Sequence, residues 1–183
     1  MIFNRSILFG ALGIGAVLLV FGAAKEARQM GNTQGYEPDQ PINFSHKVHA
    51  GENKISCRYC HYGAERGRHA GIPPTQLCLN CHSEIKKDSP EIAKIKEALD
   101  NKDPIEWIRI HQLPDFSYFN HSQHVTAGVS CQQCHGPVES MTRMRQHAPL
   151  TMGWCLECHR AQGLAPPHDQ RTMAGGDCNK CHY

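Results

Sequence analysis

All ten cysteines of this 183-residue chain occur in five copies of one short pattern, Cys-x-x-Cys-His. The copies are Cys57-Arg-Tyr-Cys60-His61, Cys78-Leu-Asn-Cys81-His82, Cys131-Gln-Gln-Cys134-His135, Cys155-Leu-Glu-Cys158-His159 and Cys178-Asn-Lys-Cys181-His182. Two thiols at this spacing can each bond to one vinyl group of a haem, while the next residue binds the iron. The pattern therefore predicts five covalently bound haem c groups. The alternatives are a disulfide framework and structural zinc, which does not need a histidine directly after the second cysteine.

The composition agrees with a fold built around a large cofactor. Hydrophobic residues make up 40% of the chain, but this share includes the ten cysteines and an apolar N-terminus. Without these residues, the hydrophobic share of the chain falls well below the roughly 45–50% of average globular domains. An ordinary side-chain core is therefore not expected. The formal net charge of +2 would become about −8 once ten haem propionates ionise, because each carries one negative charge. The composition therefore gives no support for a nucleic-acid partner.

The N-terminus predicts a membrane anchor. Residues 7–24 form an uncharged stretch of 18 residues, which is long enough to span a bilayer. A cleaved signal peptide is the alternative, because Gly22-Ala23-Ala24 could serve as a small-x-small cleavage site. We favour a retained anchor over residues 1–28, a polar linker over 29–41 and a haem domain over 42–183. Bacterial haem c is attached outside the cytoplasmic membrane, so the haem domain is expected on the periplasmic side of that membrane.

The haem domain contains an internal duplication. Phe44-Ser-His46-Lys-Val-His49 precedes Cys57, and Phe119-Asn-His121-Ser-Gln-His124 precedes Cys131 at nearly the same distance. This repeat predicts two-haem modules over about 42–88 and 117–160, followed by a single-haem tail over 161–183. Between the modules, Ser89-Pro90 predicts the start of a helix that ends near Asn101. Short helices and loops are expected throughout, with little or no sheet.

Each iron is predicted to have a proximal histidine from its own motif, and these are His61, His82, His135, His159 and His182. His46, His49, His121 and His124 are the best candidates for the distal side, because a three-residue spacing puts both rings of a pair on one helical face. Each pair could serve its own module's haems or a neighbour's, in either order. For the fifth iron the candidates are His69, His147, His111, His168 and Met152.

The chain resembles a known family in three stretches, which are residues 42–82, 113–125 and 150–160. Together with the anchor and the five motifs, they are similar to the pentahaem cytochrome c subunit of bacterial alternative complex III. The resemblance implies a mainly α fold with extensive loops, a class III-like multihaem cytochrome c domain wrapped around five haems, and one N-terminal transmembrane helix. It also implies a large iron–sulfur subunit and polytopic membrane subunits as partners, and a periplasmic electron acceptor or oxidase downstream.

The expected function is an electron wire within a membrane quinol:acceptor oxidoreductase, with no catalytic site in this chain itself. Two alternatives remain open. A stand-alone membrane-anchored quinol dehydrogenase feeding a periplasmic reductase would bind quinol beside a haem. A haem enzyme, such as a nitrite or hydroxylamine converter, would need an open iron coordination position.

Overall fold

The structure is a computed structural model that describes residues 13–24, 32–163 and 178–182. The chain divides into two compact units, Met1–Thr33 and Gln34–Tyr183. In the first unit residues 13–24 are helical, and the rest of the predicted anchor lies outside the described residues. Among the residues that the structure describes, no helix combines the length and the apolar character needed to cross a bilayer.

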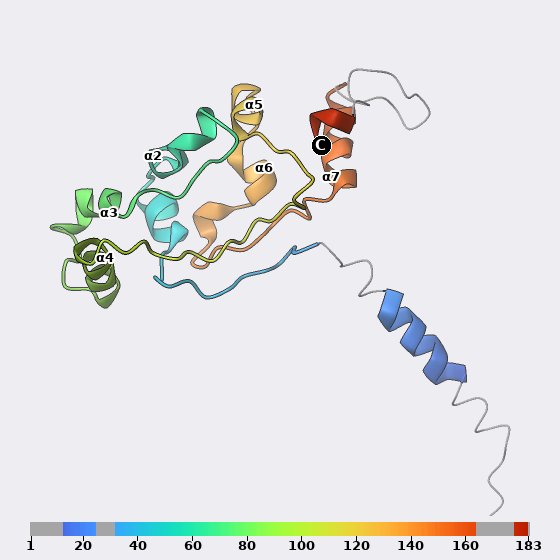
Figure 1. The fold of residues 1–183 in the computed structure, drawn as a ribbon, viewed down its shortest axis with the longest axis horizontal. Coiled ribbons are helices and arrows are strands. Elements are labelled where there is room, and N and C mark those ends of the chain that lie inside the picture. Colours follow the sequence, from blue (N-terminus) through green and yellow to red (C-terminus); the bar gives the residue numbers. More distant parts are fainter. Residues whose placement is uncertain (1–12, 25–31, 164–177, 183) are drawn as a thin grey trace, which may run out of the picture. The chain divides into compact units, whose positions relative to one another are not determined.

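The second unit is a series of short helices joined by loops (Figure 1). Its elements are η1 (Lys47–Glu52), α2 (Cys57–Cys60), η2 (Tyr62–Glu65), α3 (Thr75–His82), α4 (Pro90–Asp100), α5 (His121–Thr126), α6 (Cys131–His135), η3 (Val138–Ser140), α7 (Met152–Ala161) and η4 (Cys178–Lys180). The only strand-like pairing within the described ranges is an isolated bridge between Ser117 and His182. The prediction of a mainly helical fold is confirmed.

Every Cys-x-x-Cys-His motif begins in a helix, and these helices are α2, α3, α6, α7 and η4. Because residues three apart lie on one helical face, each motif presents its two thiols on the same side. Three of the four α-helices that carry motifs are capped by an extended residue with no side-chain hydrogen bond, so local capping contributes little to holding them. Their positions therefore depend on tertiary packing.

Helix α4 provides the small hydrophobic core beside the second motif. It begins after Ser89 with Pro90 in its first turn and ends at Asp100, with Asn101 as its C-cap, close to where the sequence predicts. Ile92 and Ile95 are buried against Ile42, with Cys78, Leu79, Leu99, Ile105 and Trp107 packed around them. Helices α3 and α4 lie side by side at one end of the unit (Figure 1). The core thus fixes the second motif relative to the segment that leads into η1.

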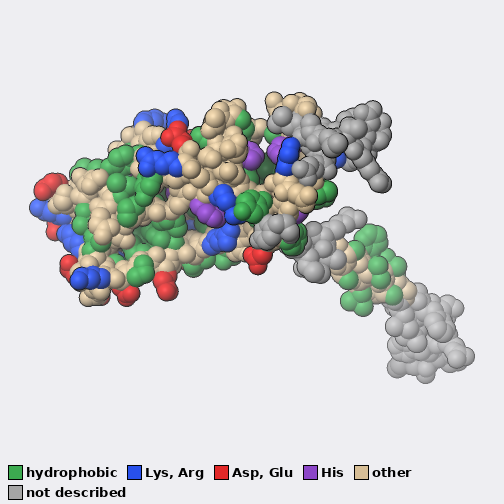
Figure 2. All heavy atoms as spheres, turned by 45° about the horizontal axis from the view of Figure 1, so that its top comes forward, with side chains coloured by type: hydrophobic (Ala, Val, Ile, Leu, Met, Phe, Trp, Pro, Cys, Tyr) green, Lys and Arg blue, Asp and Glu red, His purple; other side chains and the backbone are tan. Residues whose placement is uncertain are grey.

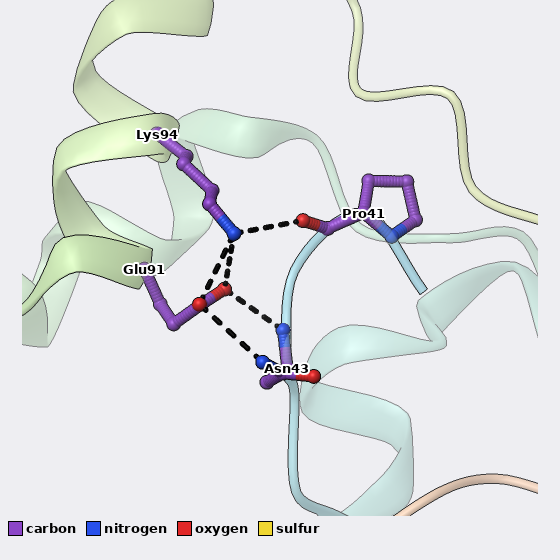
Figure 3. Close-up of polar contacts among 4 residues, drawn as sticks. All are labelled: Pro41, Asn43, Glu91 and Lys94. Atoms are coloured by element: carbon purple, nitrogen blue, oxygen red, sulfur yellow. Dashed lines mark hydrogen bonds and ion pairs between the residues drawn. The ribbon is translucent and has the colours of Figure 1, made fainter. Parts of the chain in front are cut away.

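A charged cluster attaches the segment that leads into η1 to helix α4 (Figure 3). The carboxylate of Glu91 accepts hydrogen bonds from the backbone N–H of Asn43 at 2.9 Å and from Lys94 Nζ at 3.1 Å. Lys94 Nζ also donates to the carbonyl of Pro41 at 3.2 Å. The hydrogen bond from Asn43, followed by those from Lys94, lowers the pKa of Glu91. These contacts hold the chain just before the His46-x-x-His49 pair.

Replacing Glu91 with glutamine is expected to lower the midpoint of chemical denaturation at pH 7, because the ionised acceptor is lost. Since the folded-state pKa of Glu91 is lowered, its contribution is present above the unfolded-state pKa and is lost as pH falls through the folded-state value. The difference between wild type and variant should therefore shrink from pH 7 to pH 3. The matched control is Glu97→Gln on the exposed side of α4. An equal difference at both pH values would contradict this reading.

The two modules pack on each other reciprocally. Element η1, which follows His46, packs on η3, and α5, which begins at His121, packs on η2. Equivalent hydrogen bonds join the backbones: Lys47 N–H donates to Met141 C=O at 2.9 Å, and Ser122 N–H donates to Gly67 C=O at 3.1 Å. Each His-x-x-His segment therefore rests on the turn that follows the first motif of the other module.

The predicted linker contributes its second half to the compact unit. Gly35 N–H donates to the carbonyl of Gln146 at 2.8 Å, and Gln146 N–H donates to the carbonyl of Tyr36 at 3.0 Å. Gln34 Nε2 donates to the carbonyl of His147 at 2.8 Å. Gln146 is only 1% exposed, so these bonds are largely shielded from water. Residues 34–36 are thus attached to the second module.

Candidate haem-binding sites

The five motifs follow one another in a single row. The thiols of Cys57 and Cys131 are close enough for Cys131 to help raise the pKa of Cys57, after burial, and this joins the first motif to the third. Cys60 lies beside Cys78 and Cys81 of the second motif. The order agrees with Figure 1, in which α3 lies at one end of the unit, α2 and α6 lie between, and α7 lies at the other end.

The same kind of contact extends the row on its other side. Cys134 lies beside Cys155 and Cys158 of the fourth motif, and Cys155 lies beside Cys181 of the fifth. Burial, and then the neighbouring thiols, raises the pKa of Cys60, Cys134 and Cys155, so these groups are protonated at neutral pH. The resulting order is second, first, third, fourth and fifth motif.

Four pairs of histidine rings face each other across gaps of nearly equal width. The ring centres are 6.5 Å apart for His46 and His61, 6.1 Å for His49 and His82, 6.4 Å for His121 and His135, and 6.0 Å for His124 and His159. Two imidazoles that bind one metal ion from opposite sides have two bonds of about 2 Å and two half-rings between their centres, which gives about 6 Å. Each pair thus has the spacing of two axial ligands.

The pairing is the same in both modules. The first histidine of each His-x-x-His pair faces the histidine of that module's first motif, and the second faces that of the second motif. The sequence left this order open. A single phenylalanine contacts both distal candidates of its module: Phe44 contacts His46 and His49, and Phe119 contacts their counterparts in α5. The duplicated phenylalanine was visible in the repeat, but its role was not.

Backbone carbonyls orient most of these rings. The Nδ1 atom lies 2.6 Å from a carbonyl oxygen in His61 and in His121, where the acceptors are Gly71 and Arg68. The corresponding distances are 2.8 Å in His49 and His82, 2.9 Å in His124 and 3.2 Å in His182. A proton held on Nδ1 leaves the lone pair on Nε2, so Nε2 is the atom available to a metal ion. Sequence reasoning did not find these acceptors, because any residue supplies a carbonyl.

Burial keeps the central rings neutral. It is the main reason that the pKa of His46 is lowered to about 4 and that of His135 to about 3, with nearby histidines adding to both shifts. Burial also lowers the pKa of His159. Neutral imidazole is the form that binds a metal ion, so these rings need no deprotonation at pH 7.

The fifth motif is held by the segment that leads into the second module. Tyr118 N–H donates to the carbonyl of Cys181 at 2.6 Å, and the ring of His182 lies 5.7 Å from that of Phe116. Among the candidates for its second ligand, His168 lies outside the described residues. The structure therefore places the proximal candidate, His182, beside residues 116–118.

The other candidates for the fifth iron take different positions. His69 and His147 are exposed, and Met152 is 64% exposed at the start of α7. Within the described residues, neither His69 nor His147 is in ring contact with a motif histidine. His111 lies against His135 of the third motif, with Nε2 at 3.2 Å from His135 Nδ1. His111 is therefore in contact with a ligand candidate that already faces His121.

Two buried polar atoms and a set of exposed apolar side chains test whether haem fits. His46 Nδ1 and Arg68 Nε are buried and have no hydrogen-bond partner in the polypeptide. A haem propionate is the kind of acceptor that an arginine beside a haem site binds. Figure 2 shows hydrophobic side chains and histidines at the surface of one face. Exposed apolar residues lie in or next to the motifs or supply the carbonyl acceptors, and these are Tyr59, Tyr62, Ile85 and Phe116. The two unpaired polar atoms and the exposed apolar side chains therefore fit a flat apolar cofactor.

Comparison with known proteins identifies the family of the chain. Residues 22–117 match the class III cytochrome c family, and residues 117–183 match cytochrome c7 and related cytochromes c. The chain is also 31% identical over 147 residues to the multihaem cytochrome c subunit of menaquinone reductase from Nitratidesulfovibrio vulgaris (strain Hildenborough). That alignment covers 80% of this chain and 69% of the relative. The chain belongs to the multihaem cytochromes c. This multihaem cytochrome c therefore binds haem c covalently and transfers electrons, while the number of haems and each axial ligand stay predictions.

Proposed function

We propose that this multihaem cytochrome c is a membrane-anchored electron wire with five haems, acting as a subunit of a respiratory quinol:acceptor oxidoreductase. It carries electrons from quinol oxidation toward a soluble cytochrome, an iron–sulfur protein or a terminal oxidase. The observation that carries this proposal is the single row of five motifs, in which each thiol cluster adjoins the next.

The axial ligands proposed for the first four sites are the facing pairs: His46 with His61, His49 with His82, His121 with His135, and His124 with His159. The fifth site uses His182 on the proximal side. Two imidazoles at this spacing would hold one iron from both sides, so these four sites would transfer electrons and leave no position at the metal for a substrate.

Haem supplies one-electron Fe(III)/Fe(II) chemistry when it is bound. The chain's own residues attach the haems and orient their ligands. The paired cysteines hold each group covalently, and the carbonyls that accept from Nδ1 orient the imidazoles and raise their basicity as ligands. The interlocked modules bring the first and third motifs together, which makes one continuous row from two separate halves.

The proposed location is the bacterial cytoplasmic membrane, with an anchor over residues 1–28 and the haem domain on the periplasmic side. The support is the uncharged stretch over residues 7–24 together with a relative that is named as a subunit of menaquinone reductase. The proposed partners are a large iron–sulfur subunit and polytopic membrane subunits, as in alternative complex III, which the chain resembles. The downstream partner is a periplasmic acceptor or an oxidase.

The test is purification of the native complex from membranes, followed by haem staining, intact mass and electron paramagnetic resonance of this chain. We expect the mass of five added haems, low-spin ferric signals throughout, and copurification with iron–sulfur and polytopic membrane subunits. The purified chain alone should not oxidise quinol. A control with Cys178→Ala and Cys181→Ala should lose one haem and keep four.

The opposite outcome has a definite meaning. If the chain purifies from membranes alone or with one periplasmic reductase, and oxidises a quinol analogue by itself, the wire proposal fails. The chain would then be a stand-alone membrane-anchored quinol dehydrogenase.

A further inference from the structure

We propose that His111 is a positioning residue for the third site, where it accepts a hydrogen bond from Nδ1–H of His135 and lowers the reduction potential of that site. This inference rests on the proposed ligand role of His135. It makes the third site chemically different from the first, although the two modules are duplicates.

The contact between these histidines differs from those of the other ligand candidates. His135 Nδ1 lies 3.2 Å from His111 Nε2, and the ring centres are 4.4 Å apart at an angle of 79°. The equivalent ring of the first module, His61, uses the backbone carbonyl of Gly71 instead. His82 and His182 also use carbonyls. Within the described residues, His135 is the motif histidine whose Nδ1 meets another imidazole.

His111 comes from a part of the chain that has no duplicate. It follows α4 in the segment between the modules, which is tied down by two bonds between Gln40 and the backbone of Ile108, at 2.9 and 3.0 Å. Ile110 is buried next to it, and Arg109 Nε donates to the carbonyl of His111 at 3.1 Å. The ring is therefore held in place by its own segment, and the asymmetry between the modules follows from the chain topology.

The acceptor is suited to this role by its chemistry. An imidazole nitrogen can accept a hydrogen bond through its lone pair, and His111 Nε2 lies 3.2 Å from His135 Nδ1. An imidazole nitrogen is a stronger base than an amide carbonyl oxygen, so it draws the Nδ1 proton more strongly. His135 then becomes a better electron donor to the metal, which favours the oxidised state.

The experiment uses the full-length cytochrome in its native complex and compares His111→Phe, His111→Gln and wild type by redox titration with electron paramagnetic resonance. In His111→Phe one low-spin component should move to higher potential, while the haem count and the other components stay unchanged. His111→Gln, whose amide oxygen can accept the bond, should recover most of the shift. The component that moves should be the one that is lost from the low-spin spectrum in His121→Ala, since both variants affect the third site.

Three results separate the possible meanings. Unchanged potentials in His111→Phe would overturn the inference. A new high-spin haem in His111→Phe would also overturn it, because His111 would then be an axial ligand. If the proposed function itself is wrong, the wild-type protein will already lack low-spin haems, before any variant is compared with it. Gln112→Phe, which places the same aromatic ring at the exposed neighbouring position, is the control and should leave every potential unchanged.

Discussion

Replacing His121 with alanine is expected to convert one of the five haems from low-spin to high-spin and to leave the others unchanged. His121 faces His135 with ring centres 6.4 Å apart and planes within 8° of each other, so its removal takes away one of two opposed ligands. Alanine provides no donor, and a five-coordinate or water-bound ferric haem is high-spin. About one fifth of the low-spin intensity should be lost, measured by electron paramagnetic resonance of the oxidised protein at constant haem count.

The matched control is Gln123→Ala. Gln123 is exposed in the same helix, α5, and is not a ligand candidate. Its replacement should leave the low-spin spectrum intact. An unchanged spectrum in His121→Ala would remove this residue from the ligand set, and a high-spin signal in Gln123→Ala would show that damage to α5, and not loss of a ligand, changes the spectrum.

Replacing Gly51 with alanine is expected to destabilise the domain at the contact between the two modules. A Cβ atom at Gly51 would lie 2.2 Å from the backbone oxygen of Glu139, so one of the two packed elements, η1 or η3, must move. Overpacking of this kind costs about 1–3 kcal/mol. The measurement is a denaturant titration of the haem-loaded cytochrome at pH 7, with the fraction of low-spin haem recorded alongside.

Gly67→Ala is the control, because Gly67 belongs to the opposite contact between the modules and its Cβ would meet nothing within 4 Å. It should change the midpoint little. Equal effects of the two substitutions would show that the η1 and η3 contact carries no special stability. A wild-type midpoint in Gly51→Ala would show that the modules can separate without cost.

Features set by residue type and short spacing could be predicted from the sequence. The five motifs lie on helices, and the helix from Pro90 to Asp100 begins and ends where its capping residues indicate. In each module, His-x-x-His lies on one helical segment, as the three-residue spacing predicts. Local signals of this kind need no knowledge of distant residues.

Other features depend on contacts between residues far apart in the chain, and the sequence left these undetermined. His121 is oriented by the carbonyl of Arg68, 53 positions away, and no side chain identifies a carbonyl as an acceptor. His111 was considered for the fifth iron, but it lies against His135, because the segment from Ile108 is fastened to Gln40. The second half of the predicted linker is attached to Gln146 for the same reason. The polar residues of the linker predicted an exposed segment, whereas backbone hydrogen bonds hold residues 34–36 against the second module.

The reciprocal packing of the modules has a consequence for how the cytochrome matures. A chain that leaves the ribosome from its N-terminus presents the first module before the second. The segment with His46 and His49 then has its own cysteines nearby, but η3, on which η1 packs, has not yet been made. By contrast, η2 is already present when α5 emerges. Biogenesis is therefore asymmetric although the architecture is nearly symmetric: the first half depends on a segment that is made later, whereas the second half packs on a segment that already exists.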